Sequence, residues 1–142
     1  MYHYTECGLQ NVRLRNGYTQ HKTKYGPGTA IHDVEGLHKA IGHALANRPQ
    51  LTGAELRFLR KELDLAQSAL ARLMGTSEQN ISLWERRGRM PRLADRMIKL
   101  IYIEHAGGNV KVREMIERLD LLDKKSGQLQ FEERRGDWQE AA

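Results

Sequence analysis

The spacing of apolar residues divides the chain into two parts, with the change near Pro49. After Pro49, apolar residues recur every three or four positions almost to residue 122, which is the spacing that buries one face of a helix. Before about residue 34 the side-chain types tend to alternate and turn residues interrupt them, a pattern that favours short strands. We therefore expect a mainly α protein with a small N-terminal β part.

The first fifty residues predict a short β-sheet followed by one helix. Asn16-Gly17 is a strong tight-turn dipeptide, and Gly26-Pro27-Gly28 is expected to break the chain. A sheet of two or three short strands is marginally stable alone, so we expect it to pack on the helix. The predicted elements are strands at Val12–Arg15, Tyr18–Tyr25 and Thr29–Val34 and a helix at Val34–Ala46.

Five helices are predicted after residue 50, and most have recognisable ends. Thr52 and Glu55 have the spacing of a capping box at the start of the first helix. Gly75 supplies the left-handed conformation that ends the second, and Ser77 is placed to cap the third. The predicted helices are one that begins after Thr52 and carries Leu56, Leu59 and Leu63, then Ala66–Met74, Ser77–Arg86, Arg92–Ala106 and Val110–Leu122.

The last two predicted helices carry apolar stripes. In the helix 92–106 we expect a core face made of Leu93, Met97, Leu100 and Ile101. In the helix 110–122 the stripe could complete the core or form a dimer seam, and we favour its partial use as a dimer interface. The expected division is a β-sheet plus helix at 1–50 for partner binding or dimerisation, a helical domain at 51–123 and a tail at 124–142, in which Gln128–Glu132 is the one expected strand and Trp138 is isolated.

Residues 66–86 have the spacing that a helix-turn-helix requires. Two helices cross at a steep angle only if specific positions are small or apolar, and Ala71 is small where the crossing would occur. Gly75 allows the sharp turn, Ile81 fills the angle between the helices, and Trp84 follows one turn later on the same side. The residues that then face outward are Gln79, Ser82, Leu83 and Arg86, flanked by Glu78, Asn80 and Arg87.

These outward residue types suit the recognition of DNA. A Gln or Asn side chain can bond N6 and N7 of adenine together, and a leucine can touch a thymine methyl group. Arginines beyond the helix end suit phosphates. We predict base contacts from Ser77, Glu78, Gln79, Asn80, Ser82 and Leu83, and phosphate contacts from Gln67, Arg86, Arg87 and Arg89.

Charge and composition narrow the class of protein. The 142 residues have a formal net charge of +5, and between Arg86 and Lys99 six basic residues are accompanied by one acid, Asp95. With one cysteine and no paired CxxC or HxxxH ligands, we expect neither a disulfide nor a bound metal. No catalytic motif has a supporting context, so we expect no enzyme and no cofactor. Without an apolar run of about 20 residues or a secretory signal, we expect a cytoplasmic protein without membrane contact.

The same residues carry a family resemblance. Residues 67–91, with Gln67, Leu70-Ala71, Gly75, Ser77, Ile81, Trp84-Glu85, Gly88 and Pro91 at matching positions, resemble the Cro/C1-type (XRE) helix-turn-helix of phage repressors and bacterial antitoxins. The resemblance covers about 54–103 and implies a five-helix lambda-repressor-like domain. It also implies DNA contacts at Gln67, at 77–80 and at Leu83. Arg86-Arg87-Gly88 is one residue longer before the glycine than the common pattern.

The N-terminal part is similar to MqsA-type antitoxins, which join a zinc ribbon to a helix-turn-helix. The resemblance lies in the order of the parts, in Cys7-Gly8 and in Gly36-Leu37 before a helix. That family binds zinc with two CxxC pairs. Here Tyr4 stands in place of the leading cysteine and the second pair is absent, so we expect a degenerate region without zinc.

We interpret the chain as a sequence-specific DNA-binding transcriptional repressor. A homodimer would place two copies of the helix 77–86 in successive major grooves of double-stranded operator DNA. The resemblance implies an antitoxin that also regulates its own toxin–antitoxin operon, with residues 1–50 contacting the toxin. Two alternatives stay open: a phage or mobile-element regulator without a toxin, and a protein-interaction adaptor that does not bind DNA.

Overall fold

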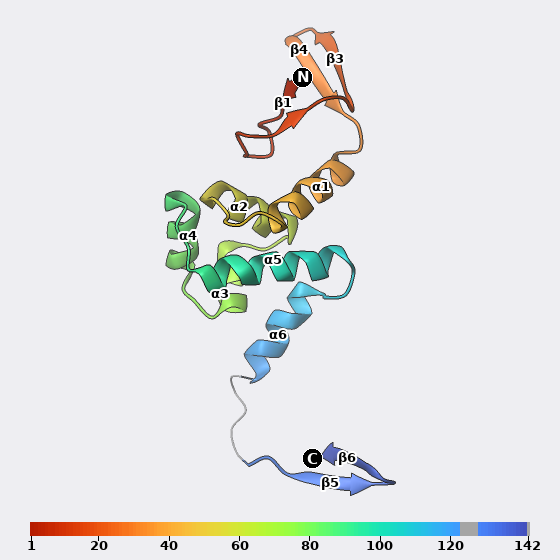
Figure 1. The fold of residues 1–142 in the computed structure, drawn as a ribbon, viewed down its shortest axis with the longest axis vertical. Coiled ribbons are helices and arrows are strands. Elements are labelled where there is room, and N and C mark those ends of the chain that lie inside the picture. Colours follow the sequence, from red (N-terminus) through yellow and green to blue (C-terminus); the bar gives the residue numbers. More distant parts are fainter. Residues whose placement is uncertain (123–127, 142) are drawn as a thin grey trace.

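The computed structural model describes residues 1–122 and 128–141, which form six helices and three two-stranded β-sheets (Figure 1). The predicted fold class, mainly helical with a small N-terminal β part, is confirmed. In chain order the elements are β1 Tyr2–His3, β2 Arg13–Leu14, β3 Tyr18–Thr23, β4 Gly26–Ile31, α1 Val34–Ala46, α2 Gly53–Glu62, α3 Gln67–Met74, α4 Glu78–Arg87, α5 Arg92–Ala106, α6 Val112–Leu122, β5 Phe131–Arg134 and β6 Asp137–Glu140. None of the helices in this part of the chain is long and apolar enough to cross a membrane.

The N-terminal β part consists of two antiparallel pairs, β1 with β2 and β3 with β4. The rings of Tyr2 and Tyr18, whose centroids are 5.4 Å apart, connect the two pairs. The predicted strands correspond to β2, β3 and β4, but β1 was not predicted, because two residues are too few to show an alternating pattern.

The expected break at Gly26-Pro27-Gly28 is wrong, because these residues begin β4. Gly17 lies opposite His32, one position before the pair of Tyr18 and Ile31. The Gly17 carbonyl accepts the His32 N–H, so Gly17 and His32 form a hydrogen-bonded pair of the antiparallel ladder. Hydrogen-bonded and non-hydrogen-bonded pairs alternate along an antiparallel ladder, so Lys22 and Pro27 form a non-hydrogen-bonded pair. An N–H at position 27 would point away from β3, so the ladder loses no hydrogen bond by having proline there.

Tyr4 connects the N-terminal segment to two helices. Its hydroxyl lies 2.8 Å from Nε2 of His38 in α1, and Nδ1 of His38 lies 3.0 Å from a carboxylate oxygen of Glu62 in α2. Burial raises the pKa of the Tyr4 phenol. The Glu62 carboxylate can only accept, so Nδ1 of His38 donates to it. The expected packing of the N-terminal part on α1 is confirmed at this contact.

The hydrophobic core is continuous from the N-terminal segment to α6. It runs from Tyr4 and Leu9 through α1 and the helix-turn-helix to Val112 and Ile116. The capping box of α2 is present as predicted, since the Thr52 hydroxyl accepts the Glu55 N–H and the Glu55 carboxylate accepts the Thr52 N–H. The large side chains with the least exposure are Leu9, Leu51, Leu56, Leu59, Leu70, Ile81 and Ile98.

The buried face of α5 differs from the prediction. The residues it buries are Ala94, Asp95, Ile98 and Tyr102, whereas Leu93 and Leu100, predicted to be in the core, are 71% and 64% exposed. Met97 and Ile101 lie half-buried beside that face. The carboxylate of Asp95 accepts the N–H of Leu51 at 2.8 Å, so this polar side chain has a hydrogen-bond partner inside. The helix is rotated by about one residue, or roughly 100°, from the orientation that hydrophobicity alone predicts.

The C-terminal elements contain one strand more than expected. β5 and β6 form a hairpin in which Glu133 lies opposite Trp138, so Trp138 is not isolated. The turn between them has Arg135 at φ 55° and Gly136 at φ 84°. A left-handed arginine is uncommon, so the sequence gives a weak turn signal there. Residues 123–127 and 142, which include the predicted boundary before the tail, lie outside the described residues.

Gly53 provides a test of the contact between α2 and α4. A Cβ atom at Gly53 would overlap the backbone carbonyl oxygen of Glu85. We expect Gly53→Ala to lower the free energy of unfolding by about 1–3 kcal/mol in urea denaturation, because backbone atoms must move to admit the methyl group.

Gly107→Ala is the matched control for this substitution. Gly107 has φ −80° and only ordinary contacts around its Cβ position, so its replacement should leave stability unchanged or slightly raised. Equal losses in the two variants would contradict a specific need for close approach at Gly53.

Candidate DNA-binding site

The turn between α3 and α4 has the geometry that its sequence predicted. Gly75 ends α3 in the left-handed region, with φ 70° and ψ 32°. The next amide, that of Thr76, donates to the Ala71 carbonyl at 3.0 Å. The hydroxyl of Ser77 accepts the N–H of Asn80 at 3.1 Å and caps α4. These local bonds fix where α4 begins.

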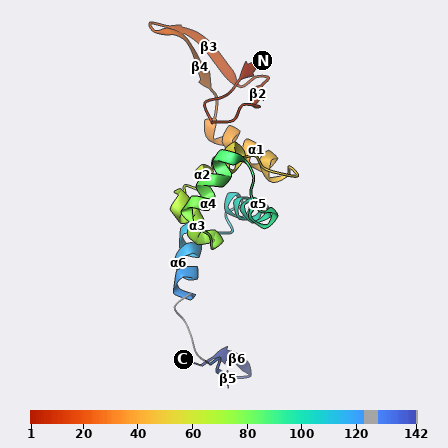
Figure 2. The same cartoon turned by 90° about the vertical axis from the view of Figure 1, so that its left-hand side faces the viewer.

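Small and branched residues set the crossing of the two helices. Ala71 is 3% exposed and Ile81 is fully buried, as predicted from their spacing. Trp84 is half-buried and packs against the same core, one turn after Ile81. The inner side of α4 is therefore the side that contains Ile81, and its opposite side lies at an edge of the molecule that faces the viewer in Figure 2.

A buried ion pair holds the C-terminal half of α4. The guanidinium of Arg60 in α2 donates to both carboxylate oxygens of Glu85, at 2.8 and 3.0 Å, and also to the Leu65 carbonyl at 2.8 Å. The Gln67 amide nitrogen donates to Glu85 at 3.3 Å. The side chains of Arg60 and Glu85 are only 10% and 5% exposed. Because these bonds have fixed directions, they hold α4 in one orientation relative to α2 and the start of α3.

Sequence reasoning did not assign this role to Arg60 and Glu85. Glu85 follows the half-buried Trp84, and Arg60 follows the fully buried Leu59. A charged residue beside the apolar face of each of two neighbouring helices, with opposite signs, is the signal that would have pointed to the pair.

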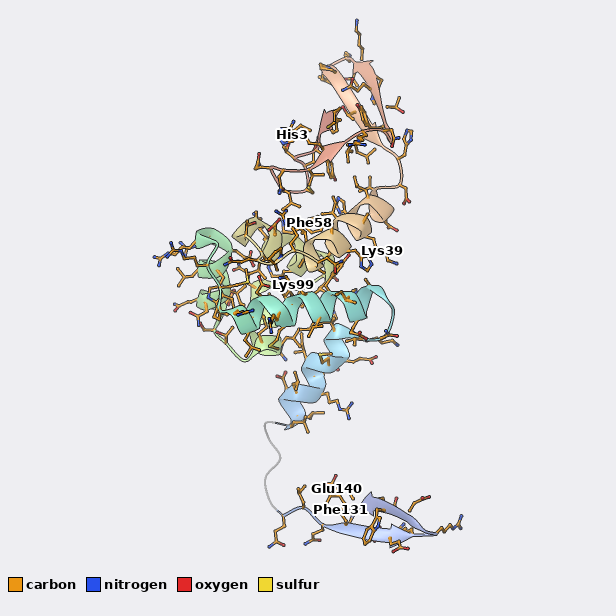
Figure 3. The ribbon with its side chains drawn as sticks, in the orientation of Figure 1. His3, Lys39, Phe58, Lys99, Phe131 and Glu140 are labelled. Carbon is orange, nitrogen blue, oxygen red and sulfur yellow. The ribbon has the colours of Figure 1, made fainter. Side chains whose placement is uncertain are left out.

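Most of the predicted site residues are at the surface of α4. Figure 3 shows side chains on the outer side of this helix projecting away from the other helices. The first predicted base contacts, Ser77, Glu78, Gln79 and Asn80, are exposed, and Ser82 and Leu83 are half-buried. The predicted phosphate contacts Arg86, Arg87 and Arg89 are exposed, and Gln67 is half-buried.

Two of the predicted contacts already have partners within the protein. The amide nitrogen of Asn80 donates to the Thr76 hydroxyl at 2.9 Å. Gln67 uses its amide nitrogen toward Glu85, as described above. Each amide has two N–H groups and a carbonyl oxygen, so both residues keep further hydrogen-bonding capacity. These internal bonds restrict the direction in which either side chain can approach a ligand.

The basic surface continues from α4 onto α5. Arg92 and Arg96 are exposed, and with Lys99 they line a hollow of about 360 Å³ beside Pro49 and Met90. Lys99 is paired with Asp95, whereas no ion pair among the described residues involves Arg92 or Arg96. Sequence reasoning counted these charges but did not place them in the site. The signal was the run of basic residues that extends past Pro91.

The described residues contain no group of three or more His, Cys, Asp and Glu side chains that could hold a metal ion. Cys7, His38 and Glu62 do lie around one cavity of about 530 Å³ between the N-terminal loop and α2. His38 and Glu62 are hydrogen-bonded to each other there.

Comparison with known proteins gives a match for one segment of the chain. Residues 56–95, from α2 into α5, match a family model described as helix-turn-helix. No curated protein and no solved structure matches the chain. The matched segment is similar to helix-turn-helix domains of the Cro/C1 type, which supports a DNA-binding transcriptional regulator. It begins after residue 55 and therefore carries no information on the N-terminal β part and α1.

The buried pair gives a second prediction. Glu85→Gln leaves the Arg60 guanidinium buried without a counter-charge, and we expect it to lower the free energy of unfolding by about 3 kcal/mol or more. The measurement is chemical denaturation followed by circular dichroism.

A double variant tests the cause of this loss. Arg60→Met combined with Glu85→Leu removes both charges and should recover much of the lost stability, because no uncompensated charge stays inside. A double variant as unstable as Glu85→Gln would contradict the electrostatic explanation.

Proposed function

We propose that this chain is a sequence-specific transcriptional repressor that binds operator DNA with α4 in the major groove. The observation that carries the proposal is the exposure of Glu78, Gln79 and Asn80 in the N-terminal half of α4, a helix that is packed on the core through Ile81. A helix of this kind fits the major groove of B-DNA, where base edges present distinct patterns of donors and acceptors.

Each part of α4 has a proposed role. The side chains of Ser77, Glu78, Gln79, Asn80, Ser82 and Leu83 contact base edges, with Gln79 as the residue best placed to read adenine. Arg86, Arg87 and Arg89 contact phosphates and set the register of the helix on the duplex, with Gln67 at the start of α3. The Arg60–Glu85 pair supports this division because it fixes the helix that carries both groups.

We further propose that the active form is a homodimer. One helix-turn-helix contacts only about half an operator, and a two-fold dimer presents two recognition helices about one turn of DNA apart. The outer side of α6 supports this assembly, since Leu119 and Leu122 are 37% and 50% exposed although they belong to the apolar stripe of the helix. Val112 and Ile116 complete the core, so the stripe serves both purposes in this proposal.

The finer role that we propose is that of an antitoxin that regulates its own operon. Residues 1–50 form the proposed partner-binding region, residues 51–123 the DNA-binding domain and residues 124–142 the tail. The support is the order of parts, with β1–β4 and α1 preceding the helix-turn-helix. A small basic nuclease-like gene directly beside this one would support the role. A lone gene would favour a phage or mobile-element regulator without a toxin.

Two substitutions test the groove model. The preferred duplex is first selected from random DNA with the unaltered protein. We expect Gln79→Ala to relax preference at the adenine it reads by about 1–3 kcal/mol. Arg87→Ala should weaken binding to all sequences similarly and reduce the salt dependence by about one phosphate contact. Both are measured by fluorescence anisotropy at fixed temperature and at several salt concentrations.

Lys111→Ala is the control, because Lys111 is an exposed basic residue just before α6 and is not assigned to the site. Its affinity for DNA should stay close to that of the unaltered protein. If Gln79→Ala and Arg87→Ala both leave operator affinity unchanged at fixed salt, α4 is not the recognition helix.

A further inference from the structure

A second excess of positive charge lies in a segment that the helix-turn-helix does not contain. Residues 7–32 include Arg13, Arg15, Lys22 and Lys24 and no aspartate or glutamate, so they contribute +4 to the formal net charge of +5. They also include His21 and His32, which add charge when protonated. A basic segment of this length without acidic residues is typical of a surface that binds a negatively charged partner.

The basic side chains of this segment are available for an external partner. All four are exposed, and the ion pairs among the described residues include none of them. The acidic residues on either side are engaged elsewhere. Glu6 accepts a hydrogen bond from the Tyr2 hydroxyl, and Asp33 caps α1 by accepting the Gly36 N–H at 3.1 Å.

The shape of β3 and β4 places this charge away from the helices. The two strands form a hairpin, here called the ribbon, that projects beyond α1 at the end of the molecule opposite α6 (Figures 1 and 2). No residue between Tyr18 and Ile31 is fully buried. At the tip, Tyr25 is 93% exposed beside Lys24, and Lys22 lies opposite Pro27 one pair further in. The ribbon thus ends in two lysines and an aromatic ring.

We propose that the ribbon is a second DNA contact, which binds the phosphate backbone of double-stranded DNA outside the groove that α4 occupies. This inference rests on the proposed function in that it takes DNA as the ligand. Charge complementarity supports it, since duplex DNA carries one negative charge per roughly 1.7 Å of its axis. The exposed Tyr25 hydroxyl beside Lys24 can add a hydrogen bond to a phosphate or sugar oxygen.

The charge of the ribbon argues against the toxin as its ligand. A small basic nuclease-like toxin, the kind of neighbour that would support the antitoxin role, would be repelled by Lys22 and Lys24 of the ribbon, for which the described residues provide no ion-pair partner. A toxin contact would therefore fall on the remainder of residues 1–50, and the ribbon is assigned to nucleic acid.

The test measures how DNA affinity depends on salt in the full-length protein. The double variant Lys22→Ala/Lys24→Ala is compared with the unaltered protein on a long duplex of unselected sequence and on the selected duplex. If both lysines contact phosphates, the slope of log affinity against log salt falls in magnitude by about 1.8, at about 0.9 per contact. Affinity falls for both duplexes by the same factor, and sequence preference does not change.

Two further variants separate charge from structure. Lys22→Arg/Lys24→Arg keeps the positive charges and should keep the slope of the unaltered protein. Lys111→Ala removes one exposed lysine just before α6, outside the ribbon, and should leave the slope unchanged. The melting temperature should change little in any of them, because the substituted side chains are exposed.

The outcomes distinguish the two proposals. If the unaltered protein binds no duplex, the proposed function fails. If it binds and Arg87→Ala weakens it, but Lys22→Ala/Lys24→Ala keeps the full slope, the function stands and the ribbon proposal is overturned. If that double variant also loses capture of an acidic protein partner while keeping the full slope, the ribbon is a protein-binding surface and not a DNA contact.

Discussion

The position of α4 depends on the ion pair between Arg60 and Glu85. Burying two opposite charges is expensive, and the cost is offset only when hydrogen bonds satisfy both groups. Here the guanidinium donates to both carboxylate oxygens and to the Leu65 carbonyl, and Gln67 donates a further bond to Glu85. Such an arrangement contributes direction more than stability, because each bond is lost if α4 rotates about its axis. The buried Arg60–Glu85 pair thus determines which side of α4, including Gln79, faces solvent.

Two glycines allow neighbouring helices to pack closely, the first of them beside this ion pair. Gly53 starts α2 directly against the Glu85 carbonyl, so α2 lies beside the same turn of α4 that the ion pair holds. A similar absence of a side chain at Gly42 lets α1 meet Tyr102 of α5. With His38 bonded to both Tyr4 and Glu62, the N-terminal part and the helix-turn-helix share one core and one hydrogen-bond chain. The N-terminal part is therefore packed against the helix-turn-helix and is not joined to it by a linker alone.

Elements with local signals could be predicted from the sequence, and those that depend on distant residues could not. The capping box at Thr52, the left-handed Gly75 and the cap at Ser77 act within a few residues, so the helix-turn-helix and its outer face were predictable. The buried face of α5 was not, because Asp95 turns inward to accept an amide 44 residues away. The β5–β6 hairpin was missed because Arg135, and no glycine or asparagine, takes the first left-handed position of its turn.

The two proposed DNA contacts divide affinity from specificity. Phosphate contacts bind any sequence and weaken with salt, whereas base contacts discriminate and depend on fixed geometry. The chain places its base-reading residue types on α4, whose orientation is fixed by buried bonds, and places two exposed lysines on the ribbon, which no fully buried residue supports. A lysine can contact a phosphate from a ribbon without a buried core, because its ammonium group is a point charge with weak directional requirements. A base contact from the same ribbon would discriminate poorly between bases, because its geometry would not be fixed. The rigid α4 thus suits base contacts, and the ribbon suits phosphate contacts.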